Sequence, residues 1–177
     1  QADGPEEQAA EGDDQDHGDP LGVGRALRQR GADEHGDVDV LRQGVVAGWL
    51  HHHKGLAGIL APTVGSYLRL QPASMSGYWC NWGGDNRNVT VRLSAEGGKK
   101  ARLEHRMADA ASNPYTAVAT VLQAALLGVQ NKYPLQPLET GDGFTHNDAP
   151  HGTAASLSEA LQDLAADTAL TTAVGPD

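Results

Sequence analysis

Apolar side chains recur at helical spacing between residues 41 and 60. They are Leu41, Val45, Val46, Trp49, Leu50, Leu56, Ile59 and Leu60. A stripe at this spacing is typical of an amphipathic helix with one face on a core, and Pro62 would end it. The adjacent residues His51, His52 and His53 would point about 100° apart on such a helix, so they would not converge on one metal ion. The pattern predicts a helix over 41–60 with three solvated histidines.

Two later stretches, 88–94 and 101–107, alternate between apolar and polar residues, which is the period of a β-strand. The turn-forming run Glu96–Lys99 lies between them. The second stretch has Leu103, His105 and Met107 on one face and Arg102, Glu104 and Arg106 on the other. These features predict a β-hairpin, with Arg92 joining the charged face from the neighbouring strand.

A second helix is predicted to begin at Asn113 and Pro114, because Asn suits the N-cap and Pro suits the first helical position. Its apolar stripe comprises Val118, Val121, Leu122, Ala125, Leu126 and Val129. The capping box Ser156–Glu159 predicts a short final helix. Residues 63–87 and 134–155 are rich in Gly and Pro and are predicted to be loops.

The N-terminal segment differs from the rest of the chain in charge. Residues 1–39 carry twelve Asp and Glu against three Arg, a balance of −9 out of the total of −10, and they contain no aromatic residue. Such a segment buries too little apolar surface to offset the entropy of ordering it. We therefore expect residues 1–40 to be disordered or translated out of frame, and residues 41–177 to form the folded part.

Several function classes are disfavoured by composition. Cys80 is the single cysteine, which makes a reducing compartment the default, and its aromatic surroundings do not suggest a nucleophile. No apolar run approaches the 18 or so residues of a membrane-spanning helix. The folded part is nearly neutral and lacks an RNA-binding or helix-turn-helix signature, so we expect no nucleic-acid partner.

Seven of the thirteen Lys and Arg residues lie between positions 69 and 106: Arg69, Arg87, Arg92, Lys99, Lys100, Arg102 and Arg106. Guanidinium groups bind phosphate and carboxylate oxygens and stay charged. An ionised Glu104 among them would suit a divalent cation. Together these groups favour phosphoryl transfer, which depends on positioning and charge neutralisation. The alternative is an ordinary solvated strand face.

Four motifs in this region resemble the catalytic domain of glutamine synthetases. They are Ala61–Leu70 (APTVGSYLRL), Asn86–Arg87, Arg102–Arg106 (RLEHR) and Asn113–Tyr115 (NPY), and their order and spacing also match over residues 41–177. The resemblance implies an α+β fold in which an antiparallel active-site sheet is packed with helices. It also implies a partial domain, because the family's N-terminal domain and last helix have no counterpart.

The resemblance also implies a role for each matching residue. Arg69 and Arg106 would bind glutamate, and Arg87 and Arg106 would act on the transferred phosphate. Arg92, Lys99 and Arg102 would bind ATP, and Glu104 would bind Mg²⁺ or Mn²⁺. The implied reaction joins glutamate to ammonia or an organic amine through γ-glutamyl phosphate, in a cytoplasmic enzyme that forms a homo-oligomeric ring.

Two departures from the family pattern limit these expectations. Met75 stands where ammonia-using members carry a glutamate, and the loop resembles the glutamate–polyamine ligase branch, which favours an organic amine. The His-x-His-x-Ser segment that precedes the first helix in the family has no counterpart in residues 1–40. An inactive homologue that binds nucleotide or supports oligomerisation is therefore the second hypothesis.

Overall fold

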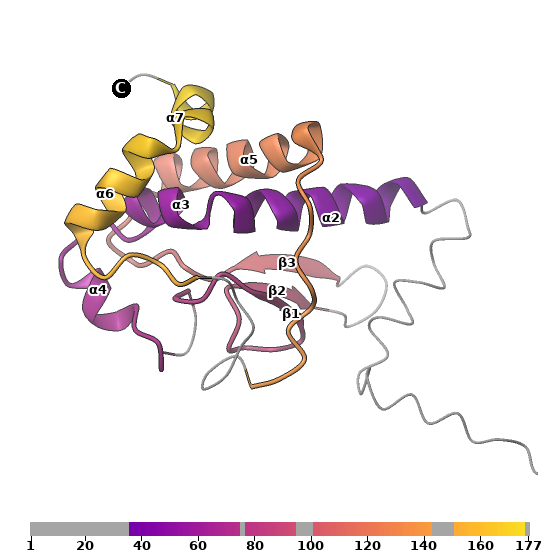
Figure 1. Ribbon diagram of the computed structural model, residues 1–177, viewed down its shortest axis with the longest axis horizontal. Helices are drawn as coiled ribbons and strands as arrows, with labels where there is room; N and C mark the ends of the chain where they lie inside the picture. The colour runs from indigo at the N-terminus through magenta and orange to yellow at the C-terminus, as the bar shows by residue number, and fades with distance from the viewer. Residues whose placement is uncertain (1–35, 75–76, 95–100, 143–150, 176–177) are drawn as a thin grey trace, which may run out of the picture.

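The computed structural model describes residues 36–74, 77–94, 101–142 and 151–175 (Figure 1). In chain order the elements are α2 (Gly36–His51), α3 (His53–Leu60), α4 (Ser66–Arg69), β1 (Trp82–Gly84), β2 (Val91–Ser94), β3 (Arg102–His105), α5 (Pro114–Asn131), α6 (Leu157–Ala166) and α7 (Thr168–Val174). Figure 1 shows α2 between the sheet and α5, with α6 and α7 beside the helical layer. The predicted α+β class is confirmed.

The first predicted helix is longer than expected and is broken. It begins at Gly36 rather than Leu41 and is divided into α2 and α3 at His52, which has φ −93° and ψ 12°. The prediction of three solvated histidines was wrong for two of them, since His52 and His53 are fully buried. His52 Nδ1 lies 2.7 Å from Asp167 Oδ2, and His53 Nε2 donates to the carbonyl of Tyr78 at 3.0 Å. Distant partners in the chain therefore allow these imidazoles to be buried.

The sheet has the strand order β1–β2–β3 and is mixed. The predicted hairpin is confirmed: β2 and β3 pair antiparallel, with Arg92 opposite Glu104. The parallel pairing of β1 with β2 was not predicted, because residues 63–87 were interpreted as a loop. That interpretation was wrong for Trp82–Gly84 and for the short helix α4.

Helix α5 packs closely on α2. Its predicted start is confirmed, since the Asn113 side chain accepts hydrogen bonds from the backbone amides of Tyr115 and Thr116. A Cβ at Gly48 would overlap the carbonyl oxygen of Ala124, and one at Gly128 would overlap that of Gly44. The two helices approach so closely that only glycine fits at these crossing points.

This close approach reverses part of the predicted burial of α5. The buried residues are Ala117, Thr120, Ala124, Ala125 and Gly128. Val118, Leu122 and Leu126 belong to the predicted apolar stripe, yet they are 59%, 63% and 47% exposed. The face of α5 that meets α2 is therefore the face with small side chains.

Helices α6 and α7 complete the described part of the chain. The capping box is confirmed at the start of α6, where Ser156 Oγ accepts from the amide of Glu159. The separate helix α7 was not predicted; Asp167 caps its first turn by accepting from the amide of Leu170 at 3.0 Å. Among the described residues, no helix combines the length and apolar character needed to cross a membrane.

Candidate active site on the sheet

Glu104 lies at the centre of a cluster of arginines on one face of the sheet. Its Oε1 is 3.0 Å from Arg102 Nη2, and its Oε2 is 3.4 Å from Arg92 Nη1 and 3.3 Å from Arg106 Nη1. Strand alternation places Arg102, Glu104 and Arg106 on the same face, and the register of β2 adds Arg92. The structure therefore brings together four of the residues predicted from the sequence, which we call the arginine cluster.

Charge interactions hold Glu104 in its ionised form. Burial alone would raise its pKa, but the positive charge of Arg92 and the hydrogen bonds from Arg102 and Arg106 outweigh that effect and leave the pKa below its ordinary value. Asp85 supplies a second carboxylate, since its Oδ1 lies 3.1 Å from Arg92 Nη2. Arg92 is therefore shared between the two carboxylates, Glu104 and Asp85.

Arg69 is held beside the end of β3. Its Nη2 donates to the carbonyl of Met107 at 2.7 Å, one residue beyond Arg106. Helix α4, which carries Arg69, is fixed by a hydrogen bond from Ser66 to Asp109 and by one from the Tyr67 hydroxyl to the carbonyl of Ala57. The predicted glutamate-binding residue is thus adjacent to the arginine cluster.

The loop that contains Met75 returns to the same place. Met75 lies outside the described residues, but Gly77 follows it with a φ of +88°. A Cβ at Gly77 would lie 2.9 Å from Met107 Cα and 3.3 Å from the carbonyl oxygen of Arg106. Glycine is required there by both the backbone angle and the close contact, which places the end of this loop against the residues that follow β3.

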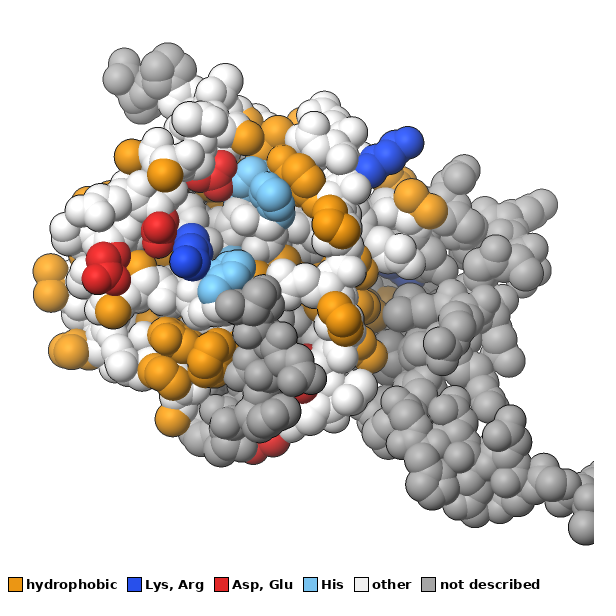
Figure 2. All heavy atoms as spheres, in the orientation of Figure 1, with side chains coloured by type: hydrophobic (Ala, Val, Ile, Leu, Met, Phe, Trp, Pro, Cys, Tyr) orange, Lys and Arg blue, Asp and Glu red, His pale blue; other side chains and the backbone are white. Residues whose placement is uncertain are grey.

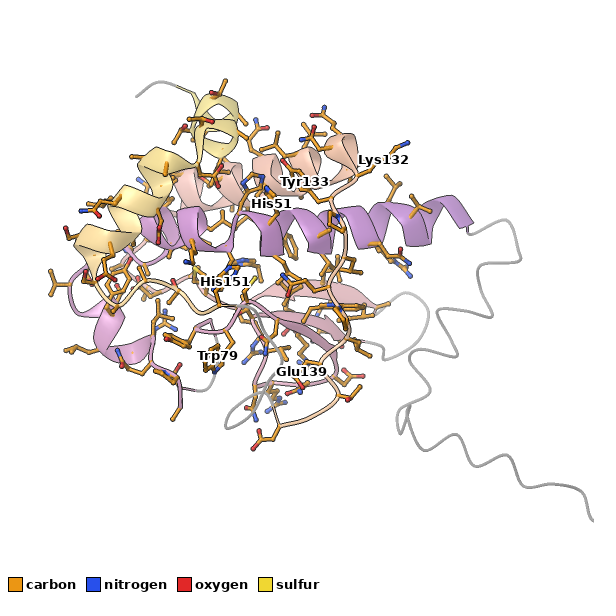
Figure 3. All side chains as sticks on the ribbon, in the orientation of Figure 1. His51, Trp79, Lys132, Tyr133, Glu139 and His151 are labelled. Carbon is orange, nitrogen blue, oxygen red and sulfur yellow. The ribbon has the colours of Figure 1, made fainter. Side chains whose placement is uncertain are left out.

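Arg87 lies outside the arginine cluster. It is exposed on the connection between β1 and β2, and it makes no ion pair with the described residues. Its neighbours fix the connection, because Asn86 Nδ2 donates to the carbonyl of Gly141 and Asn88 Nδ2 donates to Asp142 Oδ1. Figure 3 shows Glu139 of the same segment beside the sheet, where its amide donates to Trp82. Lys99 lies outside the described residues.

The opposite face of β3 anchors the sheet to α2, which sequence reasoning missed. The His105 ring meets Trp49 edge to face at 5.4 Å between centroids, and the Trp49 indole donates to the carbonyl of Val121 on α5. Burial lowers the pKa of His105 to about 4, so the imidazole is neutral at pH 7. The alternation along β3 indicated that His105 lies on the face away from Glu104. It could not indicate the partner, because Trp49 lies far away in sequence.

The chain has counterparts among known proteins. A profile of the glutamine synthetase catalytic domain matches residues 26–177. The chain belongs to the glutamine synthetase family. The glutamine synthetase of Thermotoga maritima is 32% identical over 168 residues, covering 90% of this chain and 34% of the relative. The gamma-glutamylputrescine synthetase PuuA of Escherichia coli is 32% identical over 119 residues, covering 67% of this chain and 25% of the relative.

Solved structures in this family share the fold. Apo GmaS without ligand aligns with a TM-score of 0.68 and 30% identity, covering 77% of this chain and 31% of that chain. A GmaS/ADP complex aligns with a TM-score of 0.67 and 28% identity, covering 77% and 33%. The chain spans about a quarter to a third of the length of these relatives.

Glutamine synthetases depend on ATP and a divalent metal, and the arginine cluster offers only one strand-face carboxylate to such an ion. Both Glu104 oxygens are engaged by guanidinium groups, and a divalent cation needs several oxygen ligands. No group of three His, Cys, Asp or Glu within the described ranges is arranged to hold a metal ion. The described residues of this glutamine synthetase domain therefore do not form a metal site on their own.

A separate hollow of about 540 Å³ lies where α2 and α3 meet α6 and α7. Its lining includes His51, Lys54, His151, Asp163 and Asp167, and Figure 2 shows His, Lys and Asp side chains gathered on this face. The His51 ring stacks on Tyr133 at 3.8 Å, as Figure 3 shows. None of the residues predicted to act in catalysis lines this hollow.

Cys80 is buried in the core, and its thiol donates to the carbonyl of Leu50. Burial raises the pKa of Cys80 to about 11, so a thiolate nucleophile is disfavoured at neutral pH.

Proposed function

We propose that this chain is the catalytic-domain part of an ATP-dependent ligase that joins the side-chain carboxylate of glutamate to ammonia or an organic amine. The observation that carries the proposal is the arginine cluster with Arg69 beside it, in a chain of the glutamine synthetase family. Guanidinium groups remain charged at all working pH values and neutralise carboxylate and phosphate oxygens.

The proposed reaction has two steps. First, a glutamate side-chain oxygen attacks the γ-phosphorus of ATP, which forms γ-glutamyl phosphate and releases ADP. Then the amine nitrogen attacks the acyl carbon, the carbon–oxygen bond to phosphate breaks, and the nitrogen loses a proton. Negative charge develops on phosphoryl oxygens in both steps, so fixed positive charges lower the barrier.

Each arginine has a proposed part in these steps. Arg69 binds the substrate glutamate, and Arg87 and Arg106 stabilise the transferred phosphoryl group. Arg92, Lys99 and Arg102 bind the phosphates of ATP. Mg²⁺ or Mn²⁺ bound by Glu104 would need further ligands from outside the described residues, and Glu104 would have to release a guanidinium group. The proposed assignments therefore place charge neutralisation on the arginines.

The proposed amine is organic rather than ammonia. The position six residues after Arg69 is Met75, whose thioether carries no charge to balance an ammonium ion. Gly77 returns the loop to the backbone of Arg106, which supports a place for this loop at the acyl carbon. An apolar side chain there favours the carbon chain of an alkylamine.

The whole protein is proposed to be a cytoplasmic homo-oligomeric ring. Helix α5 carries no charged residue, and Tyr115, Val118, Leu122 and Leu126 are exposed along one side of it. An uncharged helix with an exposed apolar stripe is typical of a surface covered in a larger assembly. The alternative function is a nucleotide-binding or oligomerising module without catalysis, which the lack of a metal-ligand group among the described residues favours.

The test is a ligase assay on the product of the complete gene, read upstream of codon 41 in all frames. Sequencing shows whether residues 1–40 are the proposed out-of-frame segment. We expect glutamate- and amine-dependent release of phosphate from ATP, together with a γ-glutamyl amide detected by mass spectrometry. Nucleotide binding without amide formation would instead support the non-catalytic module.

A further inference from the structure

We infer that the hollow between α2, α3, α6 and α7 binds a free α-amino acid with an uncharged polar side chain. In this site Lys54 binds the carboxylate of the ligand, and Asp163 binds its ammonium group. The described residues that line the hollow all lie outside the arginine cluster. The site is therefore separate from the proposed ligase reaction, and the inference does not depend on that reaction.

The size of the hollow suits a small molecule. Its volume of about 540 Å³ lies within the range of about 300–1,000 Å³ that small-molecule sites occupy. The lining is polar on several sides, with imidazole, ammonium and carboxylate side chains on the face that Figure 2 shows. Groups of this kind select a ligand by its charges and hydrogen bonds, so the chemistry of the lining indicates the ligand class.

Lys54 and Asp163 supply one positive and one negative charge from different helices, α3 and α6. Neither forms an ion pair with another described residue, and they do not pair with each other. Asp167, by contrast, is engaged, because it lies 2.7 Å from His52 Nδ1 and accepts from the amide of Leu170. An unpaired ammonium and an unpaired carboxylate around one hollow complement a ligand that carries the opposite pair. The zwitterion of an α-amino acid carries that pair.

His51 and His151 add two uncharged polar groups to the lining. Burial is the first cause that lowers the pKa of each imidazole below the ordinary 6.5, so both rings are neutral at pH 7. A neutral imidazole offers one N–H donor and one acceptor nitrogen. Two such rings beside the charged pair suit a hydroxyl or amide on the side chain of the ligand.

The two imidazoles are held in place before any ligand arrives. The His51 ring stacks on Tyr133, with 3.8 Å between centroids and 13° between planes (Figure 3). The carbonyl of His151 accepts from the amide of Cys80 at 3.0 Å, and its ring lies 5.9 Å from the buried ring of His53. Fixed walls reduce the ordering entropy that binding costs.

The experiment is a titration of the full 177-residue chain at pH 7 with L-asparagine, followed by NMR of ¹³C-labelled histidine rings. Two further probes each lack one charge: succinamate has no ammonium group, and 3-aminopropanamide has no carboxylate. We expect L-asparagine to shift the resonances of His51 and His151 in a saturable way. Each half-ligand should bind about threefold to tenfold more weakly, because one charged contact is missing.

Two variants assign the two ends of the ligand. Lys54→Met should weaken L-asparagine and succinamate by about threefold to tenfold and leave 3-aminopropanamide unchanged. Asp163→Asn should weaken L-asparagine and 3-aminopropanamide by a similar factor and leave succinamate unchanged. Glu159→Gln, on α6, and Lys132→Met, at the end of α5, are the matched controls. They remove the same charges outside the hollow and should bind all three probes as the unmodified chain does.

Both substituted residues lack an ion pair with the described residues, so both variants should fold, which circular dichroism checks. If one variant unfolds, the other variant and the two half-ligands still decide the outcome. The inference is overturned if L-asparagine leaves both rings unshifted, if a half-ligand binds as tightly as L-asparagine, or if neither variant changes the affinities. The titration contains neither ATP nor glutamate, so a failure here is distinct from a failure of the ligase assay on the complete gene product.

Discussion

Arg92 and Glu104 face each other at paired positions of β2 and β3, with Arg92 Nη1 3.4 Å from Glu104 Oε2. The same guanidinium also reaches Asp85, so Arg92 on the central strand contacts both β3 and the residue that follows β1. Its side chain is only 12% exposed. Cross-strand pairs of opposite charge stabilise a sheet, and burial of the partners reduces screening by solvent.

Substitutions of Arg92 and Arg87 should therefore differ in their effect on the free energy of unfolding. We expect Arg92→Met to lower the free energy of unfolding by about 1–2 kcal/mol, because Asp85 and Glu104 both lose a partner. Arg87→Met should change it by less than about 0.5 kcal/mol, since Arg87 is exposed. Urea denaturation followed by circular dichroism measures both values. Equal losses in the two variants would contradict the structural role of Arg92.

The crossing of α2 and α5 gives a second prediction. Gly48→Ala should destabilise the chain by about 3 kcal/mol or more, because the new methyl group would overlap the carbonyl oxygen of Ala124 and push two backbones apart. Gly65→Ala is the control: Gly65 has helical angles, and the nearest atom to its new Cβ would be Thr63 Oγ1 at 3.7 Å. That variant should be neutral or more stable by about 0.4–1 kcal/mol. Thermal unfolding compares them, and a tolerated Gly48→Ala would contradict the close crossing.

The same crossing explains why part of the predicted apolar stripe of α5 is exposed. Periodicity selects the largest apolar residues, here Val118, Leu122 and Leu126, as the buried side. The buried side is set instead by how near α2 approaches, and Gly44 and Gly48 permit an approach that only small residues can match. That distance belongs to a pair of helices far apart in sequence, so no local pattern contains it.

The charged hairpin was predictable because its pattern is local to each strand. An alternation with a period of two fixes which side chains share a face within each strand, so Arg102, Glu104 and Arg106 could be grouped before their contacts were known. The partners of His52 and His53 were not predictable, because Asp167 and Tyr78 are brought to them by tertiary packing. The strand β1 was missed because Trp82–Gly84 is short and two of its residues are glycine.

The buried histidines predict a loss of stability in acid. Burial lowers the pKa of His53 to about 3 and that of His105 to about 4, against an ordinary 6.5. Between these values and pH 6.5 the unfolded chain binds more protons than the folded chain, so stability falls as pH falls. Each histidine can contribute a slope of up to about 1.4 kcal/mol per pH unit. We expect the free energy of unfolding to decline from about pH 6.5 towards pH 4.

His105→Phe isolates one of these contributions. Neither ring nitrogen of His105 has a hydrogen-bond partner among the described residues, and phenylalanine keeps the edge-to-face contact with Trp49. The variant should fold and should show a shallower pH dependence between pH 4 and 6.5. His51→Phe is the comparison; His51 is exposed, so its removal should change the slope less. Urea midpoints at four pH values measure the slopes. An unchanged slope in His105→Phe would show that His105 has the same pKa in the folded and the unfolded chain.

Met75 offers a prediction about the amine. In the product of the complete gene, Met75→Glu should raise the ratio of kcat/KM for ammonia to that for an alkylamine by about tenfold or more. A carboxylate accepts charge-assisted hydrogen bonds from ammonium, each worth about 1.5–3 kcal/mol, whereas it loses the apolar contact that an alkyl chain would make. Met75→Leu is the matched control, since it keeps an apolar side chain of similar volume and should preserve the preference for the alkylamine. Equal ratios for Met75→Glu and Met75→Leu would show that the side chain at position 75 does not select the amine.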